Sequence, residues 1–167
     1  MTPRERAVET AHAAVGGAVA GLTGGFFMMV FLVLDAAGLG MGYPEPLLEI
    51  AASFIGPRAL VGGPSTVVLG LFLHFVVAAV WGALFGVLLP RDIGGGPALS
   101  YALGAAFVVL LGMTFVALPL FDPTMRARVP LYWGSWFFGH VLYGIGLALT
   151  PLLRRTFWPA PASAVTA

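Results

Sequence analysis

Two histidines, His74 and His140, are the residues in this sequence best suited to chemistry. Each lies inside a long apolar stretch, where an ionisable side chain is a candidate ligand or polar site. At helical spacing each heads a row of small residues on one face: Ala78, Gly82 and Gly86 follow His74, and Gly144 and Ala148 follow His140. For either histidine alone, the simpler interpretation is a structural hydrogen bond to a backbone carbonyl, a serine or a tyrosine.

Haem or metal binding is one alternative for the two histidines. We expect them at similar depth on helices that start from the same side, as axial haem ligands would be, and Gly144 would leave room for a ring. However, no arginine lies within the expected spans to pair with haem propionates, and a bare metal ion needs three or four ligands. Asp35 and Asp122 lie at helix ends, about 10 Å or more from the histidines along the helix axes. We therefore expect no cofactor and no metal site, and keep haem or metal at His74 and His140 as the alternative.

Signatures of enzyme chemistry are missing from the sequence. There is no Gly-x-Ser-x-Gly, no Gly-rich phosphate loop and no His-Glu-x-x-His. The chain has no cysteine, which excludes disulfides, thiolate metal ligands and thiol catalysis. Thr23 and Thr114 have no evident base beside them. We expect a protein that is not an enzyme.

The composition places the chain among integral membrane proteins. Of its 167 residues, 59% are hydrophobic and only 9% are charged, and the mean hydropathy is +0.97. Soluble domains carry roughly 25% charged residues, because they must cover a surface in water. The net charge of +1 gives no reason to expect a nucleic-acid partner, so the expected partner is the lipid bilayer.

Four apolar runs are long enough to cross a hydrocarbon core of about 30 Å, so the predicted fold is an all-α bundle of four transmembrane helices. The first is too long for a signal peptide, and we expect it to be retained. A short apolar piece in the 35–64 loop, Leu47 to Ile55, suits an interfacial helix. We expect one membrane domain over residues 1–155, with spans at about 13–34, 66–89, 98–121 and 133–153, and a disordered tail over 156–167.

The placement of arginine predicts the orientation. Five arginines flank one side of the expected bundle, against three on the other, so the positive-inside rule puts both termini in the cytoplasm. The expected location is a bacterial cytoplasmic membrane. The five are Arg4, Arg6, Arg91, Arg154 and Arg155, and the three are Arg58, Arg126 and Arg128.

Matched residues suggest an internal duplication. Aligning Asp35 with Asp122 places two glycines of the first span on glycines of the third, and aligning His74 with His140 matches the small residues of the second and fourth spans. One insertion, roughly residues 40–60, reconciles the two alignments. The sequence therefore predicts two parallel helical hairpins related by an axis along the membrane normal. The matched glycines are Gly17 with Gly104 and Gly25 with Gly112.

Rows of small residues predict where helices approach closely. Small side chains let helix backbones come together and gain dispersion contact in lipid. We expect packing within one bundle, and a homodimer interface is the sharper alternative. The rows are Gly17, Gly21 and Gly25; Ala78, Gly82 and Gly86; and Gly144 with Ala148.

Two motifs carry a resemblance to known families. The Pro-closed stretch 118–123 and the His-x-x-x-Gly stretch 139–146 resemble uncharacterised bacterial four-helix integral membrane families. The resemblance covers mainly the second half of the chain and implies fold and location only. We expect a non-enzymatic multi-pass protein that acts as a structural or assembly partner. The alternatives are a bis-histidine haem or metal protein, and a small transporter or channel component that forms a homodimer.

Overall fold

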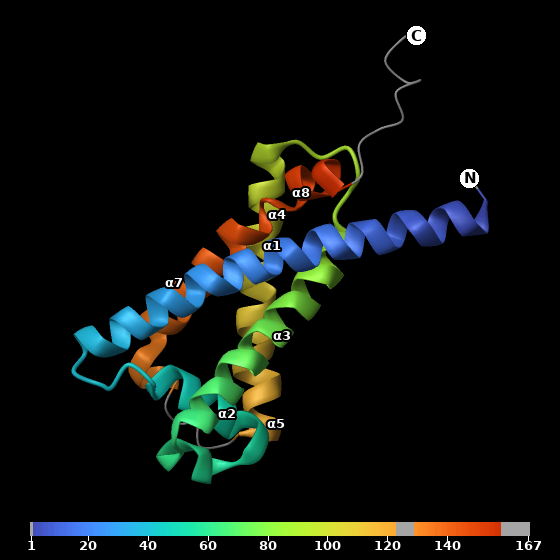
Figure 1. Cartoon of the computed structure of the whole chain (residues 1–167). Coiled ribbons are helices and arrows are strands. Elements are labelled where there is room, and N and C mark those ends of the chain that lie inside the picture. The colour runs from blue at the N-terminus through green and yellow to red at the C-terminus, as the bar shows by residue number, and fades with distance from the viewer. Residues whose placement is uncertain (1, 123–128, 158–167) are drawn as a thin grey trace.

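The computed structural model describes residues 2–122 and 129–157, and every regular element in these two ranges is a helix (Figure 1). The prediction of an all-α, four-helix bundle is confirmed. Four helical segments are long and apolar enough to cross a membrane: Pro3–Gly38, Pro64–Leu88, Gly95–Phe121 and Val129–Thr156. The elements are α1 (Pro3–Gly38), α2 (Glu45–Ile55), η1 (Pro57–Val61), α3 (Pro64–Leu88), α4 (Gly95–Gly112), η2 (Met113–Ala117), α5 (Leu118–Phe121), η3 (Val129–Tyr132), α7 (Trp133–Leu147) and α8 (Thr150–Phe157).

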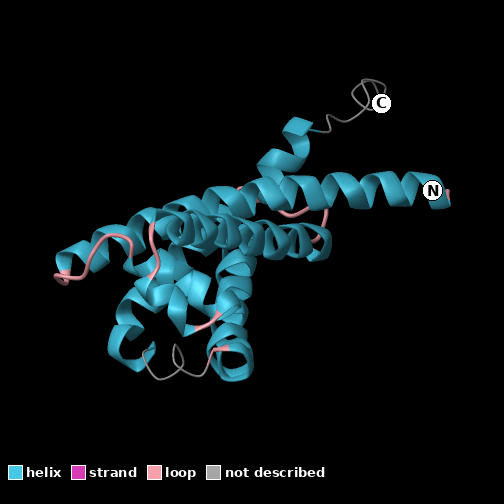
Figure 2. Cartoon of the chain, turned by 60° about the horizontal axis from the view of Figure 1, so that its bottom comes forward, coloured by secondary structure: helices cyan, strands magenta, loops and turns pink. Residues whose placement is uncertain are grey.

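Helix α1 starts ten residues before the expected span because its N-terminus is well capped. Thr2 accepts a hydrogen bond from the Glu5 backbone, the Glu5 carboxylate accepts one from the Thr2 backbone, and Pro3 takes the first helical position. The resulting 36 residues measure about 54 Å, well beyond the thickness of a hydrocarbon core. Figure 2 shows the N-terminal part of α1 projecting past the other helices.

Helices α1 and α3 meet backbone to backbone through glycine. A Cβ atom on Gly17 would lie 2.2 Å from the Gly82 carbonyl oxygen, and one on Gly86 would lie 2.8 Å from the Gly17 Cα. A Cβ on Gly21 would lie 2.3 Å from the Ala78 carbonyl oxygen. No larger side chain fits between the two helices at these positions, so this contact leaves no room for a pore between α1 and α3.

Helix α1 also meets α7 through glycines that the sequence analysis did not single out, and Gly24 lies on nearly the same face of α1 as Gly17. A Cβ on Gly146 would lie 2.2 Å from the Gly24 Cα, and a Cβ on Gly24 would lie 2.4 Å from the Tyr143 carbonyl oxygen. Helix α1 therefore packs against α3 and α7 at once (Figure 1).

Helix α4 joins the bundle through α7. A Cβ on Gly144 would lie 3.0 Å from the Ala106 Cβ and 3.3 Å from the Ala102 carbonyl oxygen, and both alanines are buried. By contrast, Gly104 and Gly112 have open space where a side chain would go. Gly104 and Gly112 therefore differ in surroundings from Gly17 and Gly25, the glycines with which the proposed repeat aligns them. The internal duplication stays a prediction.

Two proline effects shape the second half of the chain. Pro119 lacks an amide hydrogen, and its ring crowds the carbonyl four residues earlier. The turn before it widens into the π-helical η2, in which the Leu118 amide donates to the Met113 carbonyl. The fourth span breaks between α7 and α8, next to Pro151. The start of the expected tail, Thr156 and Phe157, belongs to α8, and residues 158–167 lie outside the described ranges.

Candidate functional site

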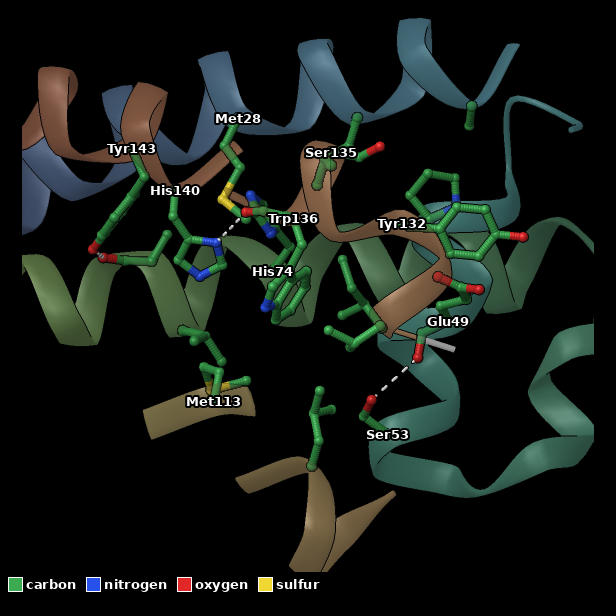
Figure 3. A pocket seen from close by; sticks show the side chains of 18 of the residues that line it. Met28, Glu49, Ser53, His74, Met113, Tyr132, Ser135, Trp136, His140 and Tyr143 are labelled. Carbon is green, nitrogen blue, oxygen red and sulfur yellow. Dashed lines mark hydrogen bonds between the residues drawn. The ribbon is translucent and has the colours of Figure 1, made fainter. Parts of the chain in front are cut away.

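A cavity of about 170 Å³ opens between α1, α2, α3, η2 and α7, and His74 and His140 both line it (Figure 3). We call it the histidine chamber. It lies toward the end of the bundle that carries α2, which we call the α2 end. Its polar lining is Asp35, Glu45, Glu49, Ser53, His74, Tyr132, Ser135, Trp136, His140 and Tyr143, and its apolar lining includes Met28, Leu32, Met41, Val77, Trp81, Val109, Met113 and Leu118.

His74 is held by a backbone carbonyl on the neighbouring helix. Its Nε2 lies 2.9 Å from the Gly25 carbonyl oxygen, and the side chain is 9% exposed. A carbonyl can only accept, so Nε2 carries the hydrogen, and Nδ1 of the neutral ring keeps a lone pair. Gly25 permits the approach, because its own Cβ would lie only 2.8 Å from that of Ala78. The interhelical hydrogen bond is of the structural kind expected from the sequence.

His140 is held in the same chemical manner by its own helix. Its Nδ1 lies 2.8 Å from the Trp136 carbonyl oxygen, and its ring stands edge-on to the Trp136 indole at a centroid distance of 4.9 Å. Nδ1 therefore carries the hydrogen and Nε2 keeps the lone pair. Both imidazoles are thus fixed in one tautomer by a backbone acceptor, with one unprotonated nitrogen each.

The π-helical turn η2 supplies one wall of the chamber. The Trp136 Nε1 donates to the Thr114 hydroxyl at 2.8 Å and ties α7 to this turn. The neighbouring Met113 lines the chamber. In Figure 3 Met28 of α1 and Met113 lie on opposite sides of the His140 ring. Sequence reasoning missed both methionines, although Pro119 signalled an irregular turn near Met113.

Tyr143 forms the floor of the chamber. Its hydroxyl donates to the Ala78 carbonyl at 2.8 Å, joining α7 to α3, and the side chain is 3% exposed. Beyond this floor, toward the end of the bundle that carries α8, come the close glycine contacts between α1 and α3. The chamber therefore ends inside the bundle.

The rim of the chamber is acidic and bound by serines. Ser135 on α7 donates to Asp35 at the end of α1, and Ser53 on α2 donates to Asp122 at 3.2 Å. These bonds tie α2 and the ends of three long segments together. Helix α2 does not lie free on a surface: it packs on α3, where a Cβ on Gly70 would overlap the Leu47 carbonyl. The rim thus places Asp35, Glu45 and Glu49 at the α2 end of the chamber.

A haem fits this site poorly. Pockets for drug-sized ligands measure about 300–1,000 Å³, and the chamber is smaller than that range. The Nε2 of His74 is already bonded to Gly25, so the two Nε2 atoms are not both available as axial ligands. Across residues 2–122 and 129–157, no group of three or more His, Cys, Asp and Glu could hold a metal ion. The space and the two lone pairs suit a ligand of a few atoms.

The expected packing residues lie mainly in helix contacts. Gly17, Gly21 and Gly25 of α1 face Ala78, Gly82 and Gly86 of α3, while Gly144 faces α4 and Ala148 packs at the edge of the main core cluster. These surfaces are covered within the chain, so a homodimer would need a different surface. No protein-family model, curated protein or solved structure matches this chain.

Proposed function

We propose that the chain is a non-enzymatic, multi-pass protein of a bacterial cytoplasmic membrane that binds a small ligand in the histidine chamber. The ligand enters from the α2 end, which faces away from the cytoplasm. The observation that carries the proposal is the chamber itself, which runs from an acidic rim to two buried imidazoles, each with an unprotonated nitrogen. The proposed family relationship adds fold and location only.

The lining supports binding, because it combines apolar walls with a few fixed polar atoms. Ligand sites in proteins have this composition, and the polar groups set orientation and specificity. Here backbone carbonyls fix both imidazoles, so no side-chain ordering is needed when the ligand arrives. The outer surface of the helices is apolar, as an interface with a partner subunit would be, but contact with lipid explains this surface equally well. We therefore favour ligand binding over an assembly role.

The hydroxyl groups of the chamber support a non-enzymatic role. Ser53 and Ser135 each donate to an aspartate, and Tyr143 donates to a backbone carbonyl. The pairing that usually activates a nucleophilic hydroxyl is a hydrogen bond to a histidine, and none of these three hydroxyl groups makes one. In the described part of the chain, the two imidazoles instead donate to backbone oxygens.

The proposed orientation rests on charge. Arg91, Arg154 and Arg155 lie at the α8 end, and the Arg154 guanidinium donates twice at 3.2 Å to the Leu89 carbonyl at the end of α3. Cations at this end agree with the positive-inside rule. The Arg154 guanidinium also provides a donor for the Leu89 carbonyl, which has no donor within its own helix because it lies at the helix C-terminus.

Single cysteines test the orientation cleanly, because the chain contains none. Val61→Cys lies in η1 at the α2 end, where Val61 is 90% exposed, and Asp92→Cys lies at the opposite end. In intact cells, a membrane-impermeant maleimide should label the first variant and leave the second unlabelled until the membrane is permeabilised. Labelling in the reverse order would overturn the orientation.

A second pair of cysteines tests entry into the chamber. Val77→Cys lines the chamber, while Val76→Cys is its neighbour on α3 and points outward at 41% exposure. A small charged methanethiosulfonate added outside should modify the Val77→Cys variant at least about tenfold faster, because a thiol in hydrocarbon does not ionise. Equal rates, or modification only from the cytoplasmic side, would refute the proposal.

A further inference from the structure

We propose that the ligand of the histidine chamber is a short amino alcohol, with its ammonium group at the acidic rim and its hydroxyl group at His140. The inference rests on the proposed function, because it names the chemical class that the same chamber would bind. It is drawn from the hydrogen-bond donors and acceptors of the lining, from the charges of the rim and from the size of the cavity.

The lining offers a ligand mainly hydrogen-bond acceptors. Six side chains of the lining already use a hydroxyl or ring N–H group to donate to an oxygen atom of the chain: Ser53, His74, Ser135, Trp136, His140 and Tyr143. The other side-chain donors of the described lining, on Trp81 and Tyr132, belong to side chains that are not buried. One nitrogen of each imidazole and the rim carboxylates still accept, so the chamber favours a ligand that donates hydrogen bonds.

The rim favours a positive charge. Asp35, Glu45 and Glu49 line this end of the chamber, and the described lining contains no arginine or lysine. An ammonium group donates charge-assisted hydrogen bonds to carboxylates, and these are about twice as strong as bonds between neutral groups. A ligand with a carboxylate at this end would instead meet like charges in a poorly hydrated site.

His140 sets the other end of the ligand. The side chain is 5% exposed, its Nδ1 donates to Trp136, and its Nε2 has no partner in the part of the chain that the structure describes. Figure 3 shows His140 and Glu49 toward opposite ends of the chamber. A methyl group against Nε2 would leave a buried acceptor unpaired, and a second ammonium would bring a charge into apolar surroundings. A hydroxyl group satisfies the nitrogen without that charge.

The size of the cavity limits the length of the ligand. A cavity of about 150 Å³ holds one benzene molecule, and the chamber measures about 170 Å³, so it holds about seven non-hydrogen atoms. Ser135, which donates to Asp35 at the rim, precedes His140 by five residues on α7, or about 7.5 Å along the helix axis. A straight chain of about five carbon atoms between two polar atoms has a similar length. Leu32 and Met113 contribute to the apolar walls that such a chain would contact.

The test uses the full chain in lipid nanodiscs, titrated with 5-amino-1-pentanol in a calorimeter, with empty nanodiscs as the blank. Each of three analogues changes one feature: pentylamine lacks the hydroxyl group, 1,5-pentanediol lacks the charge, and 6-hydroxyhexanoate carries the opposite charge. We expect one amino alcohol per chain, affinities at least about fivefold lower for pentylamine and the diol, and no binding of the hydroxy acid. Absence of amino alcohol binding, or equal affinity for any of the three analogues, would overturn the inference.

Matched variants assign the two ends of the ligand. Glu45→Gln and Glu49→Gln each remove one charge with little change of shape and should weaken binding of the amino alcohol by about fivefold or more. Glu9→Gln is the control, because Glu9 pairs with Arg91 at the opposite end of the bundle, and it should leave the affinity unchanged. Unchanged affinity in both rim variants would overturn the inference.

His140→Phe tests the contact with the hydroxyl group. The variant keeps an aromatic ring but has no acceptor nitrogen, so it should bind 5-amino-1-pentanol and pentylamine equally. A circular dichroism spectrum that stays helical shows that the variant is folded. If this variant still favours the amino alcohol as strongly as the original chain does, the placement of the hydroxyl group at His140 is wrong.

The two proposals fail separately. If Val77→Cys reacts from outside and saturating 5-amino-1-pentanol does not slow the reaction, the chamber is open and only the ligand class is wrong. If Val77→Cys is inaccessible from outside, the proposed entry is wrong as well. Slower modification in the presence of the amino alcohol, with no effect of the hydroxy acid, would support both proposals.

Discussion

Replacing Gly82 with alanine should force α1 and α3 apart. The new Cβ would lie 2.4 Å from the Gly17 carbonyl oxygen and 2.7 Å from the Gly21 Cα. Both neighbours are backbone atoms that no rotamer change can move. Restoring an ordinary contact of about 3.4 Å therefore requires the helices to separate by about 1 Å, and the dispersion contact along the whole row of glycines weakens.

The expected net cost is about 1–3 kcal/mol, the usual range for overpacking a tight core. Alanine recovers up to about 1 kcal/mol of helix propensity, which is too little to cancel the clash. At about 2–4 °C per kcal/mol for a chain of this size, the midpoint of thermal unfolding should fall by about 2–12 °C. The measurement is circular dichroism or tryptophan fluorescence of the protein in a mild detergent.

Gly104→Ala is the control for this experiment. Gly104 is also inside a helix, yet a Cβ there meets nothing within 4 Å. This variant should be as stable as the original chain or slightly more stable, because only the propensity gain remains. If the alanine variants at positions 82 and 104 unfold at the same temperature, the close α1–α3 contact is wrong.

Two further predictions concern the hydrogen bonds around the chamber. Tyr143→Phe removes the donor to the Ala78 carbonyl and should destabilise the fold by about 0.5–1.5 kcal/mol, measured as a fall in the midpoint of thermal unfolding. The reagent should still reach the cysteine of the Val77→Cys variant. An unchanged midpoint would show that this hydrogen bond does not contribute to stability. Trp136→Phe and Thr114→Val should each cost about 1 kcal/mol, and the double variant should be less destabilised than the sum, because both remove one bond. Strict additivity in that cycle would contradict the link between α7 and η2.

Hydropathy alone predicted the fold class, because four apolar runs of sufficient length allow few other solutions. It could not predict which faces pack, since outward and inward residues are similarly apolar in such helices. Phe72 is 63% exposed and Leu110 is 1% exposed, yet both are large hydrophobic residues of expected spans. Glycine was the remaining signal: it marked the small-residue faces around Gly17 and Gly82 as packing surfaces, and the structure shows that these two faces pack on each other.

The candidate site was predicted only in part, for a related reason. His74 and His140 stand out as ionisable residues in an apolar sequence, whereas Met28 and Met113 look like ordinary hydrophobic residues. That they line one chamber with the histidines depends on how the helices are arranged, and on the π-helical turn η2 that carries Met113. The position of α2 over the chamber likewise depends on its contact with Gly70 of α3.

The glycine contacts of α1 with both α3 and α7 have a consequence for how the protein is made. Helix α1 leaves the ribosome before both of its partners, α3 and α7, and more than a hundred residues separate its end at Gly38 from the end of α7 at Leu147. At about 5–20 residues per second, the face of α1 that receives Gly146 stays open for roughly 5–20 s after α1 is complete. During that time its backbone groove faces lipid or other helices, so α1 is the segment of the nascent chain most in need of a chaperoned place in the membrane.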